Sequence, residues 1–146
     1  MKKNPVNNYK SSRFILLLVI IFTLFNFISA CVSANIFLPV AATIPMLFTI
    51  LGVAGDLSGA TVILIIILLL YLLCWILSKK NYKWMIDAAV LYAIDTIVMF
   101  WFYGLSFDAT RILDMIIHIY IMYCFISGCI SGKILKEKND VEEKEL

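Results

Sequence analysis

Four apolar runs, each about as long as a membrane-spanning helix, dominate this sequence. A helix needs about 20 apolar residues to cross the hydrocarbon core of a bilayer, and runs of about this length occupy residues 14–34, 60–77, 84–103 and 112–130. The chain is 63% hydrophobic and 15% charged, whereas soluble domains are about half apolar and about one quarter charged. We therefore expect an all-α integral membrane protein whose 146 residues form a single membrane domain.

The positive charges predict on which side of the membrane each connecting segment lies. All but one of the 12 Lys and Arg residues fall in three groups, which precede residue 14, lie between residues 79 and 83, and follow residue 132. Short cytoplasmic segments next to membrane spans carry an excess of Lys and Arg. Four spans put all three groups on one side. We therefore predict a four-transmembrane-helix bundle with both termini, including the tail at residues 133–146, in the cytoplasm.

A further hydrophobic segment, residues 35–57, follows the first run almost without a polar break and includes the stretch FLPVAATIPMLFTILG. If this segment crossed the membrane, the basic groups would be divided between the two sides, so we place it outside. Pro39 and Pro45 each lack a backbone donor and disfavour helix immediately before them. A short helix that begins at Pro45 and lies flat at the outer interface is the favoured interpretation. A re-entrant loop and a fifth span remain open.

The first run also has features of an export signal. A basic start precedes it, VSA at residues 32–34 resembles a cleavage site, and ISAC at residues 28–31 resembles a lipoprotein motif that would lipidate Cys31. The apolar core of a signal peptide is usually about 7–15 residues long, which is shorter than this run. We expect an uncleaved span, with cleavage and lipidation of Cys31 as the alternatives.

Three ionisable residues, Asp95, Asp114 and His118, lie well inside the predicted spans. An unpaired charge at the bilayer centre costs at least about 2.5 kcal/mol, so such residues usually face the bundle interior and find a partner. Measured from the segment that connects the last two spans, Asp95 lies about 13 Å and His118 about 10 Å along its helix. Asp114 and His118 are four residues apart and share a helix face. We expect these residues to form an intramembrane polar cluster.

This cluster has three interpretations. Asp95 and His118 can hydrogen-bond each other and fix two helices in register, which is the favoured interpretation. An Asp–His pair can also relay protons, because histidine titrates near neutral pH. Two carboxylates and an imidazole could also bind a divalent metal, but their spacing matches no metal motif. We therefore predict no metal site.

Gly128 and Gly132 form a Gly-x-x-x-Gly pair in the last predicted span. Small residues at this spacing let helix backbones approach closely. Packing against another helix of the same chain is the favoured interpretation, and homodimerisation through this surface remains open.

The segments LYLLCWILSKK, WMIDAAVLYAIDTIVM and ILDMIIHIYIMYCFISG follow one another in the second half of the chain. Over residues 60–132 they resemble small, uncharacterised four-span membrane proteins of Gram-positive bacteria. The resemblance implies a multi-pass protein of a bacterial plasma membrane. It implies no activity, substrate or site residues.

The sequence contains no nucleotide-binding glycine fingerprint, phosphate loop or Cys-x-x-Cys pair. Its four Cys residues are spaced neither as a zinc site nor as a redox pair. We expect no catalytic residues, no cofactor and no nucleic-acid partner. The favoured function is a non-enzymatic accessory or interaction subunit in the lipid bilayer, either as a homo-oligomer or with another membrane protein. The alternative is a small proton- or ion-coupled transporter that uses the Asp/His cluster.

Overall fold

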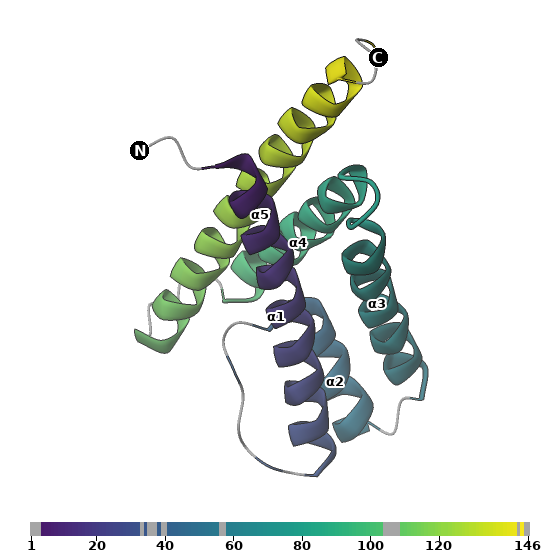
Figure 1. Cartoon of the computed structure of the whole chain (residues 1–146). Helices are drawn as coiled ribbons and strands as arrows, with labels where there is room; N and C mark the ends of the chain where they lie inside the picture. Colours follow the sequence, from purple (N-terminus) through teal and green to yellow (C-terminus); the bar gives the residue numbers. More distant parts are fainter. Residues whose placement is uncertain are drawn as a thin grey trace.

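Five helices make up the described part of the chain in a computed structural model (Figure 1). The described residues are 4–32, 34, 38, 41–55, 58–103, 109–142 and 144, without the side chains of 51–55, 58, 60, 102–103 and 109–110. The helices are α1 (Pro5–Cys31), α2 (Thr43–Gly55), α3 (Ser58–Leu77), α4 (Lys83–Tyr103) and α5 (Ala109–Glu142). Because these residues contain no β-strand, the expected all-α class is confirmed.

Three of these helices, α1, α4 and α5, are long and apolar enough to cross a membrane. They lie at three of the four positions where the sequence predicts spans. The fourth position holds α3, which is 20 residues long and apolar over the stretch from Thr61 to Leu77.

The first helix begins well before the predicted start of its apolar run at residue 14. The side chain of Asn4 accepts the N–H of Val6 at 3.0 Å, and Pro5 occupies the first helical position. An asparagine cap followed by proline is a favourable helix start, because proline lacks the backbone donor that would otherwise need a partner there. The local sequence therefore extends α1 beyond its apolar part.

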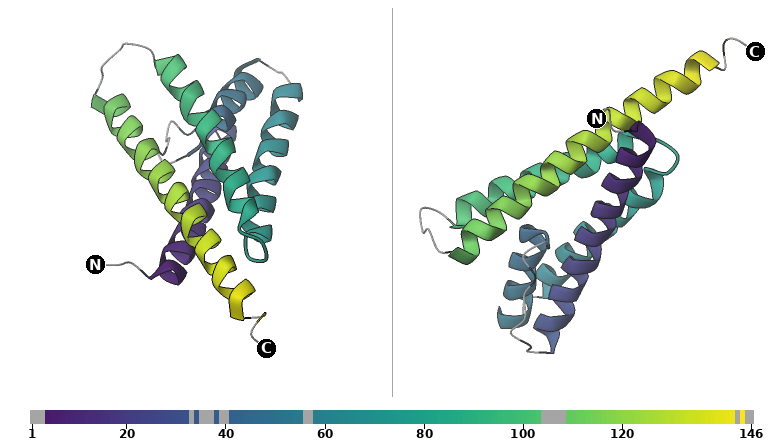
Figure 2. Two further views of the ribbon diagram at one scale, coloured as in Figure 1. Left: turned by 90° about the horizontal axis from the view of Figure 1, so that it is seen from above. Right: turned by 60° about the vertical axis from the view of Figure 1, so that its left-hand side comes forward.

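The last helix continues to Glu142 and includes most of the predicted tail. Lys133 and Glu137 approach to 3.8 Å, and Lys138 and Glu142 to 3.6 Å. Each pair is four residues apart and stabilises an exposed helix by about 0.2–0.5 kcal/mol. As a result, α5 projects beyond the bundle as a polar arm, residues 133–142 (Figures 1 and 2).

Two helices, α1 and α4, make most of the connections within the bundle. α1 packs against α2, α3 and α5, and α4 also packs against α2, α3 and α5. Both views of Figure 2 show α4 and α5 running side by side. The buried core between these helices includes Leu16, Val19, Tyr71, Cys74, Met85, Ala88, Tyr92, Ile121 and Phe125.

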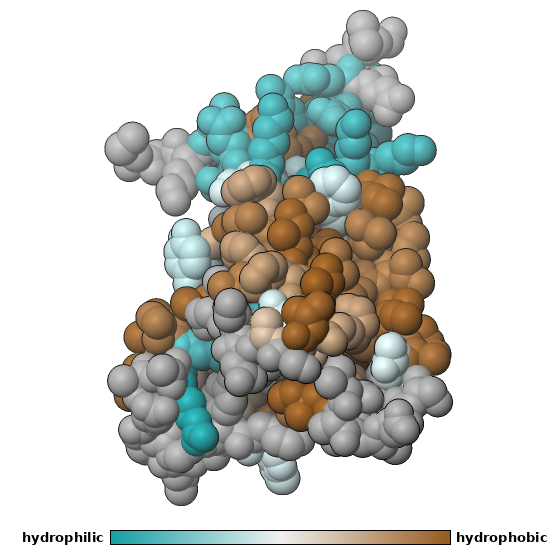
Figure 3. Space-filling view, turned by 90° about the horizontal axis from the view of Figure 1, so that it is seen from below, coloured by the Kyte–Doolittle hydropathy of each residue, from teal (hydrophilic) through white to brown (hydrophobic). Residues whose placement is uncertain are grey.

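The outside of the bundle is apolar. Large apolar side chains on α3 have between 42% and 55% of their surface exposed, namely Val62, Ile63, Ile65, Ile66, Leu69, Leu70, Leu73 and Ile76. Figure 3 shows apolar residues across the middle of one face and hydrophilic residues gathered at one end. Contiguous apolar surface of this extent is typical of a protein that faces lipid rather than water.

The Gly128–Gly132 pair faces α1 of the same chain. A Cβ atom added at Gly128 would lie 2.5 Å from the Cβ of Ser12, and one added at Gly132 would lie 2.9 Å from Cε2 of Tyr9. At this close approach the hydroxyl of Ser12 donates to the carbonyl oxygen of Cys124 at 2.7 Å. The small surface of α5 is therefore filled by α1, and a homodimer that used it would have to displace α1.

The first half of α1 also binds the end of α3. Tyr9 donates its hydroxyl hydrogen to the carbonyl oxygen of Ser78 at 2.6 Å. Arg13 donates from Nε to Ser78 Oγ at 3.0 Å and from Nη2 to the carbonyl oxygen of Trp75 at 3.1 Å. A positive side chain at a helix C-terminus offsets the partial negative charge of its unpaired carbonyl groups. These contacts fix the position of α1 against α3.

Replacing Gly128 by alanine should destabilise the bundle, because the added methyl group would overlap Ser12 and force α1 and α5 apart. Overpacking of this kind costs about 1–3 kcal/mol. Gly59→Ala is the matched control, since nothing lies within 4 Å of a Cβ at that position and alanine favours a helix. The measurement is the midpoint of thermal unfolding in detergent micelles, followed by circular dichroism. Equal midpoints for the two variants would contradict the close packing of α1 on α5.

Candidate functional site

The short helix α2 occupies a place that differs from the favoured prediction. It packs against α1, α3 and α4, and Thr43, Pro45 and Thr49 are buried. In Figure 1 it runs alongside α1 and α3 and begins partway along them. This lengthwise packing of α2 within the bundle supports the re-entrant alternative better than the favoured prediction of a helix that lies flat at the outer interface. The helix begins at Thr43, two residues before the predicted start, whereas Pro39 lies outside the described residues.

A carboxylate from α4 satisfies the first backbone donors of α2. Asp95 is only 1% exposed, and its Oδ2 accepts the N–H of Thr43 at 2.8 Å while its Oδ1 accepts the N–H of Ile44 at 2.7 Å. The next residue, Pro45, has no N–H to satisfy. The first turn of a helix carries unpaired donors and a partial positive charge. A single buried carboxylate therefore meets both needs, which explains why α2 can begin inside the bundle.

Two polar side chains of α1 hold the chain just before α2. Thr23 Oγ1 accepts the N–H of Ala42 at 3.0 Å. Asn26 pairs with both backbone groups of Leu38, since its Nδ2 donates to the carbonyl oxygen at 3.0 Å and its Oδ1 accepts the N–H at 2.8 Å. Buried non-helical backbone needs hydrogen-bond partners for its N–H and C=O groups. Thr23 and Asn26 supply such partners.

His118 of α5 lies beside the Asp95 carboxylate and has no exposed surface. Its Nε2 lies 3.6 Å from Asp95 Oδ2 and 3.4 Å from Thr43 Oγ1. Its Nδ1 lies 3.0 Å from the carbonyl oxygen of Asp114 and 3.3 Å from Oδ1 of the same residue. The structure thus brings Asp95, Asp114 and His118 together at the start of α2. We call these three residues the Asp–His cluster.

Aromatic side chains hold the imidazole in place. The rings of Tyr92 and His118 stack with centroids 5.3 Å apart and planes inclined by 16°. The ring of Tyr92 also contacts the ring of Phe125 edge to face, with centroids 5.3 Å apart. The hydroxyl of Tyr92 is buried and has no hydrogen-bond partner among the described residues. The imidazole is therefore fixed between a flat aromatic surface and two carboxylates.

This arrangement can accept a proton without any helix moving. The backbone carbonyl of Asp114 can only accept, so Nδ1 of His118 carries a hydrogen. If the imidazole is neutral, Nε2 can accept the hydroxyl hydrogen of Thr43. If it is protonated on both nitrogens, Nε2 faces Asp95 with a hydrogen, and the positive charge lies between two carboxylates. Among the described residues, no three His, Cys, Asp or Glu side chains are arranged as metal ligands.

Thr23, Asn26 and Thr43 are site residues that no sequence pattern had marked. Thr23 and Asn26 are three residues apart, so they share one face of an otherwise apolar helix. This spacing could have predicted that the face of the helix with Thr23 and Asn26 contacts a polar group. The contacts at Thr43 and Ile44 are made by backbone N–H groups, which no side-chain pattern marks.

The chain matches no protein-family model, no curated protein and no solved structure.

Replacing Asp95 by asparagine should loosen α2. One acceptor oxygen would become an NH₂ donor that faces a backbone N–H of Thr43 or Ile44, and an unsatisfied buried donor costs about 1–3 kcal/mol. We expect a lower unfolding midpoint in detergent and faster hydrogen exchange across residues 43–55 than in the wild type.

Asp87→Asn makes the same chemical change on the same helix at an exposed position, so it should leave both quantities unchanged. If the two variants exchanged hydrogen at the same rate across α2, the role of Asp95 in holding this helix would be contradicted.

Proposed function

We propose that the chain is a multi-pass protein of a bacterial plasma membrane that spans it with α1, α3, α4 and α5. Three of these helices are long and apolar enough, and α3, with 20 residues, would extend about 30 Å, the thickness of the hydrocarbon core. The distribution of Lys and Arg supports a cytoplasmic position for both termini and for the turn between α3 and α4. In this topology α2 is a re-entrant half-helix that enters from the outside.

Cysteine labelling tests this topology. In a variant whose four native Cys are replaced by alanine, Gly59→Cys should react with a membrane-impermeant maleimide in intact cells. Lys80→Cys should react only after the cells are permeabilised, because its segment is cytoplasmic. Both positions are exposed, so access from the wrong side, rather than burial, is what would prevent reaction. The opposite pattern would overturn the proposed orientation.

Within this membrane protein we infer a non-enzymatic accessory or interaction role. The observation that carries this proposal is that the Asp–His cluster is engaged by helix backbone and by its own members. Asp95 binds the first turn of α2, and His118 lies between Asp95 and Asp114. Groups held in this way fix α2, α4 and α5 relative to one another. The cluster then acts as a support, and the protein works through its surface.

The arm of α5, residues 133–142, offers such a surface. It is polar and projects beyond the bundle (Figure 2). Ile134 and Val141 are 48% and 56% exposed and are seven residues apart, so they lie on one face of the helix. An apolar pair on a charged helix suits packing against a helix of another membrane protein or of a second copy of this chain.

A small proton-coupled transporter is the second candidate. It is favoured by one observation, which is that the N-terminus of α2, Asp95 and His118 meet at a single buried point. Many transporters place the N-terminus of a half-helix at their substrate and ion sites near the bilayer midplane. The ionisable side chains that face His118 are Asp95 and Tyr92 from α4 and Asp114 from its own helix.

Flux measurements in proteoliposomes distinguish the two functions. For an accessory protein, proton and cation flux should equal that of protein-free liposomes, and His118→Gln should only lower the unfolding midpoint. For a transporter, the wild type should carry proton flux along an imposed pH gradient. In His118→Gln this flux should be lower by about tenfold or more, because a glutamine side chain, unlike an imidazole, cannot take up a proton. Asp87→Asn serves as the control with unchanged flux. Wild-type flux that His118→Gln abolishes without unfolding the protein would overturn the accessory role.

A further inference from the structure

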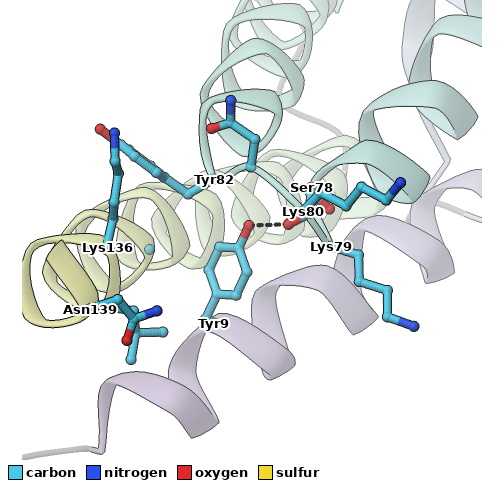
Figure 4. Close-up of a pocket in the computed structure, with 10 residues that line it drawn as sticks. Tyr9, Ser78, Lys79, Lys80, Tyr82, Lys136 and Asn139 are labelled. Carbon is cyan, nitrogen blue, oxygen red and sulfur yellow. Dashed lines mark hydrogen bonds between the residues drawn. The ribbon is translucent and has the colours of Figure 1, made fainter. Parts of the chain in front are cut away.

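A cavity of about 500 Å³ opens where α1, the turn between α3 and α4, and α5 meet (Figure 4). Tyr9 of α1 lies at the centre of this view, with its hydroxyl bonded to the carbonyl oxygen of Ser78. Lys136 of α5 lines one side of the cavity, and Lys79 and Lys80 of the turn line another. The cavity is far from the Asp–His cluster along each helix. It is large enough for a small organic ligand, since such sites occupy about 300–1,000 Å³.

The lining of this cavity favours an anion. Lys79, Lys80 and Lys136 are exposed, and the amides of Asn81 and Asn139 add hydrogen-bond donors. None of the described residues that line it is acidic. In Figure 4 the side chains of Lys79 and Lys80 extend from the rim away from Tyr9. Lysine has a flexible four-carbon stem, so these ammonium groups can turn toward an anion that enters the space left open.

Backbone charges at the ends of two helices add to this preference. The helix α4 begins at Lys83, whose N–H is accepted by the side chain of Asn81 at 3.0 Å. The positive end of the α4 dipole therefore lies at the cavity. The negative end of α3 lies nearby, but Arg13 donates to its carbonyl oxygen at Trp75. The start of α4 and the three lysines therefore favour an anion at the cavity, while Arg13 offsets part of the negative end of α3.

Apolar groups line the same cavity. Leu135 and the rings of Tyr9 and Tyr82 contribute to its walls. Gly132 lets both tyrosine side chains pack directly on α5, because a Cβ at this position would lie 2.6 Å from the Cβ of Tyr82 and 2.9 Å from Cε2 of Tyr9. A ligand held here thus meets both positive charge and apolar surface. The headgroup region of an anionic phospholipid combines a phosphate ester with adjacent glycerol and acyl carbons, which matches this combination.

We propose that this cavity binds the phosphate ester of an anionic phospholipid at the basic end of the bundle. The three lysines neutralise the phosphate, the side-chain amides of Asn81 and Asn139 donate hydrogen bonds to it, and Leu135 and the tyrosine rings contact the glycerol and upper acyl carbons. Basic cavities between membrane helices at their cytoplasmic ends bind acidic headgroups by this chemistry. Because Tyr9, the α3–α4 turn and α5 all contribute, a bound lipid would also hold these three elements together.

Native mass spectrometry of the full chain in neutral detergent tests this proposal. We expect one molecule of dioleoyl phosphatidylglycerol to bind about tenfold or more tightly than dioleoyl phosphatidylcholine. The variant Lys79→Gln/Lys80→Gln/Lys136→Gln should lose this preference. All three side chains are exposed, so the variant should fold, and an unchanged circular dichroism spectrum would verify this.

The matched control is Lys133→Gln/Lys138→Gln/Lys144→Gln, which removes the same charge from the same end of the molecule but from residues that do not line the cavity. It should keep the preference for phosphatidylglycerol. An equal loss in both triple variants would show only surface attraction to anionic lipid and would overturn the site.

Glycerol 3-phosphate alone tests whether a soluble phosphate ester, rather than a lipid headgroup, is the ligand. If it bound as tightly as the lipid, the assignment of a lipid headgroup would be overturned.

Discussion

Both oxygens of the Asp95 carboxylate accept backbone N–H groups at the first turn of α2, and the place of α2 inside the bundle depends on this contact. A helix that begins in a buried place needs partners for its first donors and a negative charge for its positive end. Asp95 supplies both, and Pro45 removes one donor that would otherwise need a partner. His118 then lies against Asp95 from α5. One carboxylate therefore connects α2, α4 and α5, while Thr23 and Asn26 connect α1 to the segment that leads into α2.

The rest of the bundle is held by close approach and by polar contacts more than by burial of apolar surface. Among lipid chains, two apolar helices gain little from hiding their side chains from the surroundings, so backbone proximity and hydrogen bonds between helices determine which helices associate. Gly128 and Gly132 let α5 approach α1, and Ser12 makes a hydrogen bond across the contact. At the end of α3, Tyr9 donates a hydrogen bond to the carbonyl oxygen of Ser78, and Arg13 donates one to the carbonyl oxygen of Trp75. The largely apolar exterior of α3 leaves this helix dependent on such contacts along one face.

The two polar regions of the molecule differ in whether their polar side chains are open to a ligand. The Asp–His cluster is closed, because Asp95 is engaged by backbone donors and His118 is enclosed by Asp114 and the ring of Tyr92. This supports a role in holding the fold, and the same geometry leaves room for one additional proton. The cavity at the basic end is open and carries lysine, amide and tyrosine side chains without an internal acidic partner among the described residues that line it. Contact with lipid or with another protein is therefore better supported at that end than chemistry at the cluster.

Hydropathy and charge alone determined the helical class and the positions of the long apolar helices, because both properties act over short stretches of chain. The spacing of Asp114 and His118 likewise placed them on one helix face, and similar distances from a shared connection put Asp95 and His118 at nearly the same level. The sequence did not reveal that Gly128 and Gly132 pack against Ser12 and Tyr9, because nothing in an isolated small-residue motif specifies its partner. It also did not reveal that α2 packs lengthwise against α1, α3 and α4. Thr43 and Asp95 are separated by 52 residues, and the donors that Asp95 binds are backbone groups present in almost every residue. Only the tertiary structure, in which these groups come within hydrogen-bond distance, could decide that α2 begins inside the bundle.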